Sequence, residues 1–254
     1  MEFLDIAVEA AKKGGAILDR YFETSLSREV KADKSFVTKA DTEAEAAIIA
    51  EIKKSFPDHG ILGEESGEEK SSSPFTWIID PLDGTGNFVN GIPLFSVSIA
   101  VLKSSVPVAA VVYNPSSDSL YAGAKGKGVL WNGKRVRVSD GDTEHAMISF
   151  GPGKGEKERL NRLISSAELF VKSKRYLGAC ALELAYVARG GTEGFICLGL
   201  NKWDYAAGVL LVEEAGGKIT DVEGNPWVFG SRDYFIASNG KIHDALLKLI
   251  KKAA

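Results

Sequence analysis

One stretch decides the fold of this chain: Trp77-Ile78-Ile79-Asp80-Pro81-Leu82-Asp83-Gly84-Thr85-Gly86-Asn87-Phe88. Its first three residues form an apolar run, which predicts a buried strand. Pro81 lacks the N–H group that a strand ladder needs, so we expect the strand to end at Asp80-Pro81. Two acids, Asp80 and Asp83, therefore follow directly on a buried strand.

These two acids need a partner, because an isolated buried carboxylate is costly. No Lys or Arg occurs between Ser71 and Lys103, which excludes a local ion pair. A bound cation is the expected partner, and oxygen-only ligands suit a hard ion such as Mg²⁺. The next residues, Gly84-Thr85-Gly86, offer backbone N–H groups that can cradle a phosphate. A metal beside a phosphate predicts phosphate-ester chemistry.

Composition sets broad limits on the function. The chain has 254 residues, a net charge of −3 and 44% hydrophobic residues, which is typical of a globular protein. Nothing in it favours a nucleic-acid or membrane partner, and no apolar run reaches the roughly 18 residues of a membrane span. Residues 1–5 do not resemble a signal peptide. Cys180 and Cys197 lack metal-type spacing, so we expect a reduced, cytoplasmic protein.

The order of the patterns predicts an α+β protein with two subdomains. Residues 1–145 combine two amphipathic helices, over 3–22 and from Asp41 to before Pro57, with β-rich runs that predict an antiparallel sheet. A polar stretch at 65–74 predicts a solvated loop. Residues 146–254 alternate helices and strands, which predicts an α/β subdomain that closes a cleft.

Three further acids each have a structural and a functional interpretation. Asp41, or Thr38, could cap the second helix, and Asp204 could cap the helix that it opens. Glu64, after the short apolar run Ile61-Leu62, could belong to the solvated loop. In the functional interpretation, Glu64 and Asp204 are metal ligands.

Taken together, these residues favour the functional interpretation. Glu64, Asp80, Asp83 and Asp204 give four carboxylates, which would repel one another unless about two divalent cations neutralise them. Two metals suit phosphoryl transfer, because one activates the attacking water and the other stabilises the leaving oxygen. The Thr85 hydroxyl, with Asp41 as its partner, could orient that water.

The chain resembles the inositol monophosphatase family of Mg²⁺-dependent, lithium-sensitive phosphatases. The resemblance rests on Gly63-Glu64-Glu65-Ser66, on the stretch from Trp77 to Phe88, and on Trp203-Asp204-Tyr205-Ala206-Ala207-Gly208, in the order and spacing of the family. It covers nearly the whole chain. The resemblance implies a layered α-β-α-β-α fold, usually in a homodimer.

The resemblance also implies roles for single residues. Glu64, Asp80 and the Leu82 carbonyl would hold a first Mg²⁺, Asp80, Asp83 and Asp204 a second, and Glu64 with waters a third. Thr85, paired with Asp41, would orient the nucleophilic water, and the Gly84 and Thr85 N–H groups would bind phosphate. Gly178, Ala179 and Cys180 match the segment that lines the alcohol side of the substrate.

One position departs from the animal-type members of the family. They carry an acid that binds inositol hydroxyls where this chain has Cys197, and a thiol is a poorer acceptor. Arg175, with its neighbours Lys172 and Lys174, could instead meet a second phosphate, or could be a solvated strand end. The segment from Leu177 to Ala188 looks most like the archaeal branch, whose members often hydrolyse both inositol-1-phosphate and fructose-1,6-bisphosphate.

These observations predict a phosphomonoesterase for a small phosphate ester, acting on inositol-1-phosphate and also on fructose-1,6-bisphosphate. Two alternatives remain open. One is a phosphatase for 3′-phosphoadenosine-5′-phosphate. The other is a non-catalytic regulatory protein that binds a metal or a phosphosugar.

Overall fold

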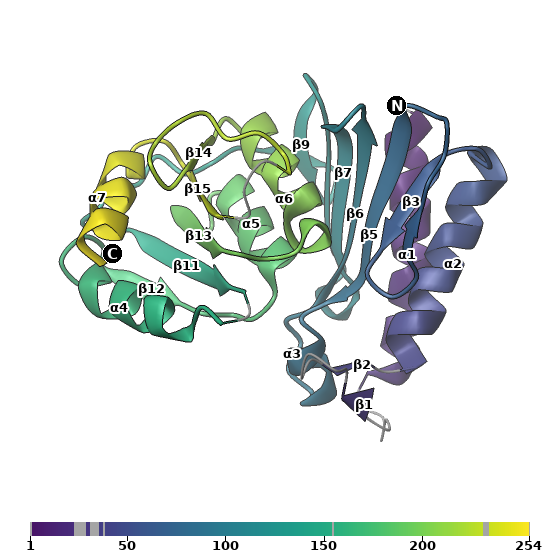
Figure 1. Cartoon of the computed structure of the whole chain (residues 1–254), viewed down its shortest axis with the longest axis horizontal. Coiled ribbons are helices and arrows are strands. Elements are labelled where there is room, and N and C mark those ends of the chain that lie inside the picture. The colour runs from purple at the N-terminus through teal and green to yellow at the C-terminus, as the bar shows by residue number, and fades with distance from the viewer. Residues whose placement is uncertain are drawn as a thin grey trace.

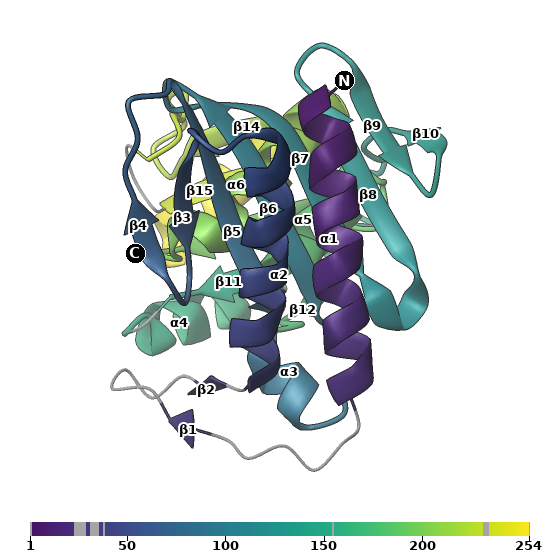
Figure 2. The same cartoon turned by 90° about the vertical axis from the view of Figure 1, so that its right-hand side faces the viewer.

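The computed structural model describes residues 2–22, 29–30, 36–37, 39–153, 155–230 and 234–253. The chain stacks helices, a large sheet, helices, a small sheet and helices in five layers (Figure 1). This confirms the predicted α-β-α-β-α fold. The outer pair α1 (Glu2–Tyr21) and α2 (Lys39–Ser55) covers one face of the large sheet, as Figure 2 shows. Thr38, a predicted capping residue, lies outside the described residues.

The large sheet has eight strands and is mixed, whereas the sequence predicted an antiparallel sheet. Its parallel pair joins β3 to β5, which pack side by side along four residues. In spatial order its strands are β10 (Lys134–Val136), β9 (Gly128–Trp131), β8 (Ser119–Ala124), β7 (Val106–Asn114), β6 (Ser96–Lys103), β5 (Phe75–Asp83), β3 (Gly60–Gly63) and β4 (Gly67–Glu69). The presence of β4 corrects the prediction of a plain loop at 65–74.

Strand β5 continues through Pro81, where the sequence predicted that it would end. Asp80 pairs with Ser98 and Asp83 with Ser96, so β5 has one residue more than β6 between these pairs. Such a bulge leaves a residue without a ladder partner, and this is where Pro81 is tolerated. The bulge keeps both Asp80 and Asp83 on the strand. Because of the extra residue, their side chains do not follow the regular alternation between the two faces of the sheet.

The small sheet confirms the predicted α/β organisation of the second half. In spatial order its strands are β12 (Ser173–Arg175), β11 (Met147–Pro152), β13 (Gly194–Leu198), β15 (Tyr234–Ser238) and β14 (Lys218–Asp221). Helices α4 (Lys157–Ala167) and α7 (His243–Ala253) cover its outer face (Figure 1). The predicted subdomain boundary at 145/146 falls in the connection between β10 and β11.

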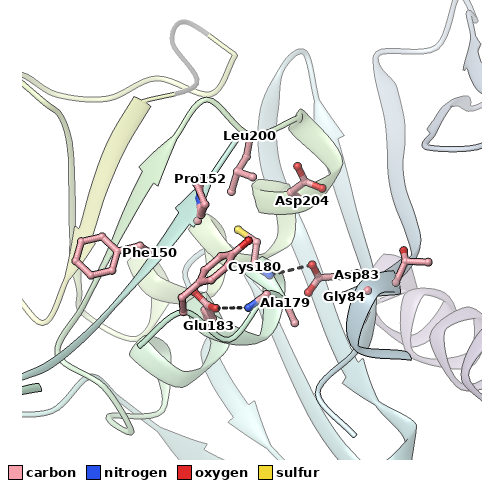
Figure 3. Close-up of a pocket in the computed structure, with 14 residues that line it drawn as sticks. Asp83, Gly84, Phe150, Pro152, Ala179, Cys180, Glu183, Leu200 and Asp204 are labelled. Atoms are coloured by element: carbon pink, nitrogen blue, oxygen red, sulfur yellow. Dashed lines mark hydrogen bonds between the residues drawn. The ribbon is translucent and has the colours of Figure 1, made fainter. Parts of the chain in front are cut away.

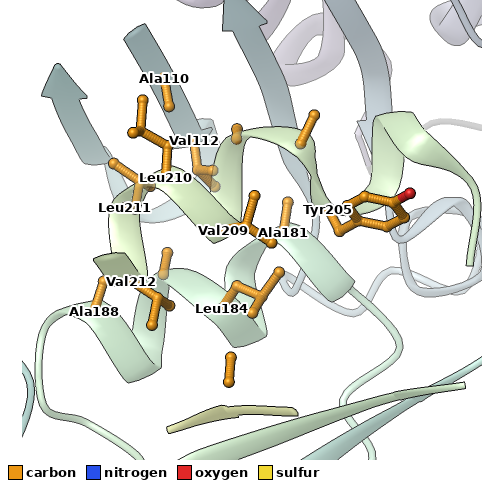
Figure 4. Close-up of a cluster of buried hydrophobic side chains, with 14 of the residues drawn as sticks. Ala110, Val112, Ala181, Leu184, Ala188, Tyr205, Val209, Leu210, Leu211 and Val212 are labelled. Carbon is orange, nitrogen blue, oxygen red and sulfur yellow. The ribbon is translucent and has the colours of Figure 1, made fainter. Parts of the chain in front are cut away.

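The middle layer joins the two sheets. It consists of α5 (Cys180–Ala188) and α6 (Lys202–Glu214), both with apolar side chains on most faces because each helix is covered on two sides. Figure 4 shows Leu210 and Leu211 of α6 beside Ala110 and Val112 of β7. The two helices approach closely at Gly208, where a Cβ atom would lie 2.5 Å from the Leu184 side chain.

Four further short elements lie in the described chain. Strands β1 (Glu29–Val30) and β2 (Phe36–Val37) pair with each other, and the one-turn helix α3 (Thr85–Val89) follows β5 directly. A 3₁₀ turn spans Pro115–Ser117. In the part of the chain that the structure describes, no helix combines the length and the apolar character that crossing a membrane requires.

Candidate active site

A cleft of about 320 Å³ lies where the end of β5 meets the N-termini of α5 and α6 (Figure 3). Both halves of the chain line it. The described lining residues are Asp83, Gly84, Thr85, Gly86, Phe150, Gly151, Pro152, Tyr176, Gly178, Ala179, Cys180, Glu183, Leu200 and Asp204. Most of the predicted phosphate-binding and alcohol-side residues are therefore brought together.

Asp80 is buried within electrostatic reach of the other three predicted acids, of which Asp83 and Asp204 line the cleft. It is 1% exposed, and burial raises the pKa of its carboxyl well above the usual range. The carboxylates of Glu64, Asp83 and Asp204 raise that pKa further, in this order. The N–H of Leu82 donates to Asp80 Oδ1 at 3.0 Å and offsets the penalty only in part. Negative charge is thus concentrated around Asp80.

Asp83 has a more favourable environment than Asp80, although it is also buried. Its carboxylate accepts hydrogen bonds from the N–H groups of Cys180 and Ala181, at 2.9 and 3.0 Å, and from the Ser96 hydroxyl at 3.2 Å. Burial raises the pKa of Asp83 to about 7, and these hydrogen bonds oppose that rise. Asp83 therefore caps the N-terminus of α5 from across the cleft, a role that its spacing in the sequence does not reveal.

Asp204 lies in the first turn of α6, but it is not the N-cap residue. Asn201 is the N-cap, and its N–H donates to Asp204 Oδ2 at 2.7 Å in a capping box. Asp204 also lines the cleft and contributes to the raised pKa of Asp80. The structural and functional interpretations of Asp204 are thus compatible.

The predicted catalytic residues are Glu64, Asp41 and Thr85. They lie near the carboxyl end of β5, which we call the β5 side of the cleft. Glu64 is half-buried in the turn after β3, and its N–H donates to the Ile79 carbonyl at 3.1 Å. Asp41 lies inside the first turn of α2 and is 1% exposed, so it is not the residue before the helix. The Thr85 hydroxyl donates to the Leu82 carbonyl at 3.0 Å. Its pairing with Asp41 stays a prediction.

The alcohol side of the cleft is built from backbone. Gly178, Ala179 and Cys180 line it, and a Cβ atom on Gly84 would lie 3.1 Å from the Ala179 Cβ. The Asn87 side chain donates to the Leu177 carbonyl at 2.7 Å. Burial raises the pKa of the Cys180 thiol, which keeps it protonated and unsuited to act as a nucleophile.

Glu183 belongs to the site, and the sequence analysis missed it. It is 1% exposed, and its Oε1 accepts the N–H groups of Leu177 and Gly178 at 2.7 and 3.0 Å (Figure 3). Burial raises its pKa to about 8. The one signal in the sequence is an acid inside the otherwise apolar run Ala181 to Val187, where a charge needs a structural or chemical reason.

Two predicted substrate-binding residues are not among the described residues that line the cleft. Cys197 is on β13, 0% exposed and packed in the core that α5 and α6 share. Arg175 is exposed at the end of the edge strand β12, and its guanidinium donates to the Lys174 carbonyl at 2.8 Å. Lys174 itself pairs with Glu168 at 2.6 Å. The neighbour of Arg175 that does line the cleft is Tyr176.

The predicted ligands Glu64, Asp80, Asp83, Asp204 and the Leu82 carbonyl are all oxygen donors, a chemistry that suits a hard divalent cation. In the described residues, however, no three of these four acids have ligand atoms that all lie within 4.8 Å of one another. The group that meets this limit there is Asp142, Glu144 and His145. These three side chains are exposed on a turn, where they are solvated, so they give no comparable reason to bind an ion.

Comparison with known proteins agrees with the site. The model of the inositol monophosphatase family matches residues 1–254. A fructose-1,6-bisphosphatase/inositol-1-monophosphatase of Aquifex aeolicus is 40% identical over 257 residues, which is 99% of this chain and 96% of that protein. The Nus factor SuhB of Escherichia coli is also 40% identical, over 96% of this chain and 94% of that protein. The IMPase structure of Thermotoga maritima superposes with a TM-score of 0.93 and 36% identity, covering 100% of this chain and 98% of that chain. The chain belongs to the inositol monophosphatase family.

Proposed function

We propose that this protein is a Mg²⁺-dependent phosphomonoesterase that hydrolyses inositol-1-phosphate and, with it, fructose-1,6-bisphosphate. The observation that supports the proposal is a cleft that Asp83, Gly84 and Thr85 of the first half line together with Asp204 of the second half. Glu64, Asp80, Asp83, Asp204 and the Leu82 carbonyl would hold two to three Mg²⁺ ions. When bound, these ions supply the activation of a water and the neutralisation of charge on the leaving oxygen.

The protein's own groups bind and orient the phosphate. Gly84 has a φ of +87°, which glycine adopts without strain, and a Cβ there would lie 2.8 Å from the Leu94 carbonyl. This backbone conformation turns the chain so that the Gly84 and Thr85 N–H groups can face a phosphate. In the proposed mechanism, the Thr85 hydroxyl turns from the Leu82 carbonyl to the attacking water. Its oxygen accepts a proton from that water while its own proton passes to the Asp41 carboxylate, so the hydroxyl is restored.

The alcohol part of the substrate would lie against Gly178, Ala179 and Cys180 at the N-terminus of α5, which we call the α5 side of the cleft. Apart from Tyr176, Glu183 and Asp204, the described lining residues there are small or apolar, and no Lys or Arg is among the described residues of the lining. A polyol monophosphate can be accommodated without a second charged subsite. A bisphosphate would have to place its second phosphate beyond this described lining, toward the mouth of the cleft near Tyr176. We therefore expect inositol-1-phosphate to be the better substrate.

Two alternative functions remain open. A 3′-phosphoadenosine-5′-phosphate phosphatase would use the same acids. A non-catalytic regulatory role is the second alternative, and the relatives named Nus factor SuhB favour keeping it. We also propose a cytoplasmic homodimer.

The test is phosphate release from the three esters side by side, with Mg²⁺ and with chelator. The proposal expects turnover of inositol-1-phosphate that chelator abolishes, and slower turnover of fructose-1,6-bisphosphate. Preferential turnover of 3′-phosphoadenosine-5′-phosphate would show that this nucleotide, and not inositol-1-phosphate, is the substrate. Binding of inositol-1-phosphate in calorimetry without any turnover would favour the regulatory role.

A further inference from the structure

Glu45 is a buried carboxylate with no role in the mechanism given above. It lies on α2, is 3% exposed, and points at the turn that carries Glu64. Its two oxygens accept two consecutive backbone N–H groups: Oε2 accepts that of Glu65 at 3.0 Å, and Oε1 accepts that of Ser66 at 2.7 Å. Hydrogen bonds to a charged acceptor are among the stronger ones in proteins, so the turn is held firmly at these two points.

The residue before Glu64 provides the space for this arrangement. A Cβ atom on Gly63 would lie 2.6 Å from Glu45 Oε2, closer than real Cβ atoms approach. Glycine at position 63 therefore lets the Glu45 carboxylate reach the turn. On the other side, the N–H of Glu64 donates to Ile79 of β5 at 3.1 Å. Three successive peptide groups, 64 to 66, are thus fixed by α2 and β5 together.

This fixation matters because Glu64 is a half-buried side chain on a turn, not a residue inside a strand. A ligand on a turn contributes to a metal site only if its backbone is held in place. We propose that Glu45 is a positioning residue, which fixes the turn so that the Glu64 carboxylate is presented to the cation. The inference rests on the proposed metal-dependent function.

Four single variants separate positioning from two simpler effects, namely the electric field of Glu45 and general loss of stability. Glu45→Gln keeps one acceptor and places an NH₂ donor against the other backbone N–H. Glu45→Asp keeps the charge but is one methylene too short to reach both N–H groups. Gly63→Ala changes no charge and displaces the Glu45 carboxylate. Glu51→Gln is the matched control, because Glu51 is also buried on α2 but pairs with Lys13 and Lys54.

Mg²⁺ binding to each full-length protein is measured by calorimetry without substrate, alongside melting temperatures in chelator and the Mg²⁺ dependence of phosphate release. We expect Glu45→Gln, Glu45→Asp and Gly63→Ala each to weaken Mg²⁺ binding about 10–100-fold, as removing an outer partner of a metal ligand typically does. The Mg²⁺ concentration for half-maximal rate rises in parallel. Glu51→Gln lowers the melting temperature and leaves the Mg²⁺ affinity unchanged.

Three outcomes would overturn the inference. Wild-type Mg²⁺ affinity in Glu45→Gln would show that the turn needs no clamp. Wild-type affinity in Glu45→Asp together with weak binding in Glu45→Gln would assign the effect to charge alone. Equal loss of Mg²⁺ affinity in Glu51→Gln would assign the effect to a general loss of stability.

Failure of this inference can be told apart from failure of the proposed function. If the wild type hydrolyses inositol-1-phosphate with Mg²⁺ and the Glu45 variants bind Mg²⁺ normally, only this inference is wrong. A wild-type protein that binds no Mg²⁺ removes the proposed function as well.

Discussion

The two sides of the cleft offer a phosphate ester different chemistry. The β5 side holds Asp80, whose pKa is raised first by burial and then by the carboxylates of Glu64, Asp83 and Asp204. The α5 side offers backbone N–H groups and small side chains on a segment that Asn87, Asp83 and Glu183 hold in place. The first side therefore gathers carboxylates, whereas the second side is fixed by hydrogen bonds between its backbone and buried side chains.

Asp80 and Asp83 make the comparison sharpest, because they are three residues apart on the same strand and both buried. Three donors from other elements stabilise the charge of Asp83. Asp80 accepts a hydrogen bond from the Leu82 N–H of its own strand and has three acidic neighbours. Burial alone is thus a poor guide to the need for a cation. The balance of donors and like charges around each carboxylate decides it.

The largest effect is expected at Asp80. Asp80→Asn removes the central charge of the β5 side, and metal-assisted catalysis supplies several kcal/mol of transition-state stabilisation. Phosphate release should fall on the order of 10³-fold at saturating inositol-1-phosphate. Steady-state assays over a range of Mg²⁺ concentrations measure this. Retention of more than a tenth of the rate would contradict the assignment of Asp80 as a metal ligand.

A smaller loss of activity separates the two roles of Asp204. Asp204→Asn keeps an oxygen that can accept the Asn201 N–H, so the helix should stay capped while Mg²⁺ binding and rate fall by about 10²-fold. Asn201→Ala makes the opposite change: it should cost about 1 kcal/mol of unfolding free energy and leave the Mg²⁺ affinity intact. Chemical denaturation and calorimetry on both variants check this pair. If the two variants behaved alike, Asp204 would be only a capping residue.

The α5 side gives a prediction about pH. Glu183 has an ordinary pKa of 4.5 and a folded pKa of about 8, so between these values the folded state binds more protons than the unfolded state. Stability in chelator should therefore fall as pH rises from about 4.5 to 8, and level off above. Asp83 contributes with the same sign up to about pH 7.

Glu183→Gln should reduce this pH dependence, because its amide oxygen can still accept both N–H groups and no charge forms. Denaturation curves at pH 5 and pH 8 measure the difference between the variant and the wild type. An unchanged pH dependence would mean that Glu183 is already ionised across this range.

The smallest effect is expected outside the cleft. Arg175 is exposed and bonded to its neighbouring carbonyl, so Arg175→Ala should change kcat/KM for fructose-1,6-bisphosphate less than about threefold, within the range of a rim charge. Tyr176→Ala is the matched comparison, because that side chain lines the cleft and should raise the KM for inositol-1-phosphate several-fold. A larger effect at Arg175 than at Tyr176 would assign a second-phosphate role to the arginine.

Apolar periodicity in the sequence predicted the helices and sheet of the first half and the α/β second half, and the family resemblance implied the layered fold. The convergence of the four acids on a cation stays a prediction. The sequence did not predict the bulge at Pro81, which depends on how β5 registers with β6. It also missed Glu45 and Glu183. An acid on a helix resembles a solvated residue until the tertiary structure places backbone N–H groups against it. For Asp204 the sequence offered capping as the alternative to metal binding. The N-cap is Asn201, and Asp204 completes its capping box.

The most direct test of the charge imbalance is the melting temperature of the wild type and Asp80→Asn, each in chelator and in Mg²⁺. In chelator, the variant should melt at a higher temperature, because it no longer buries a carboxylate among like charges. Mg²⁺ should raise the melting temperature of the wild type and leave the variant almost unchanged, so that their order reverses. A wild type that is the more stable protein in chelator, or that Mg²⁺ does not stabilise, would contradict the account.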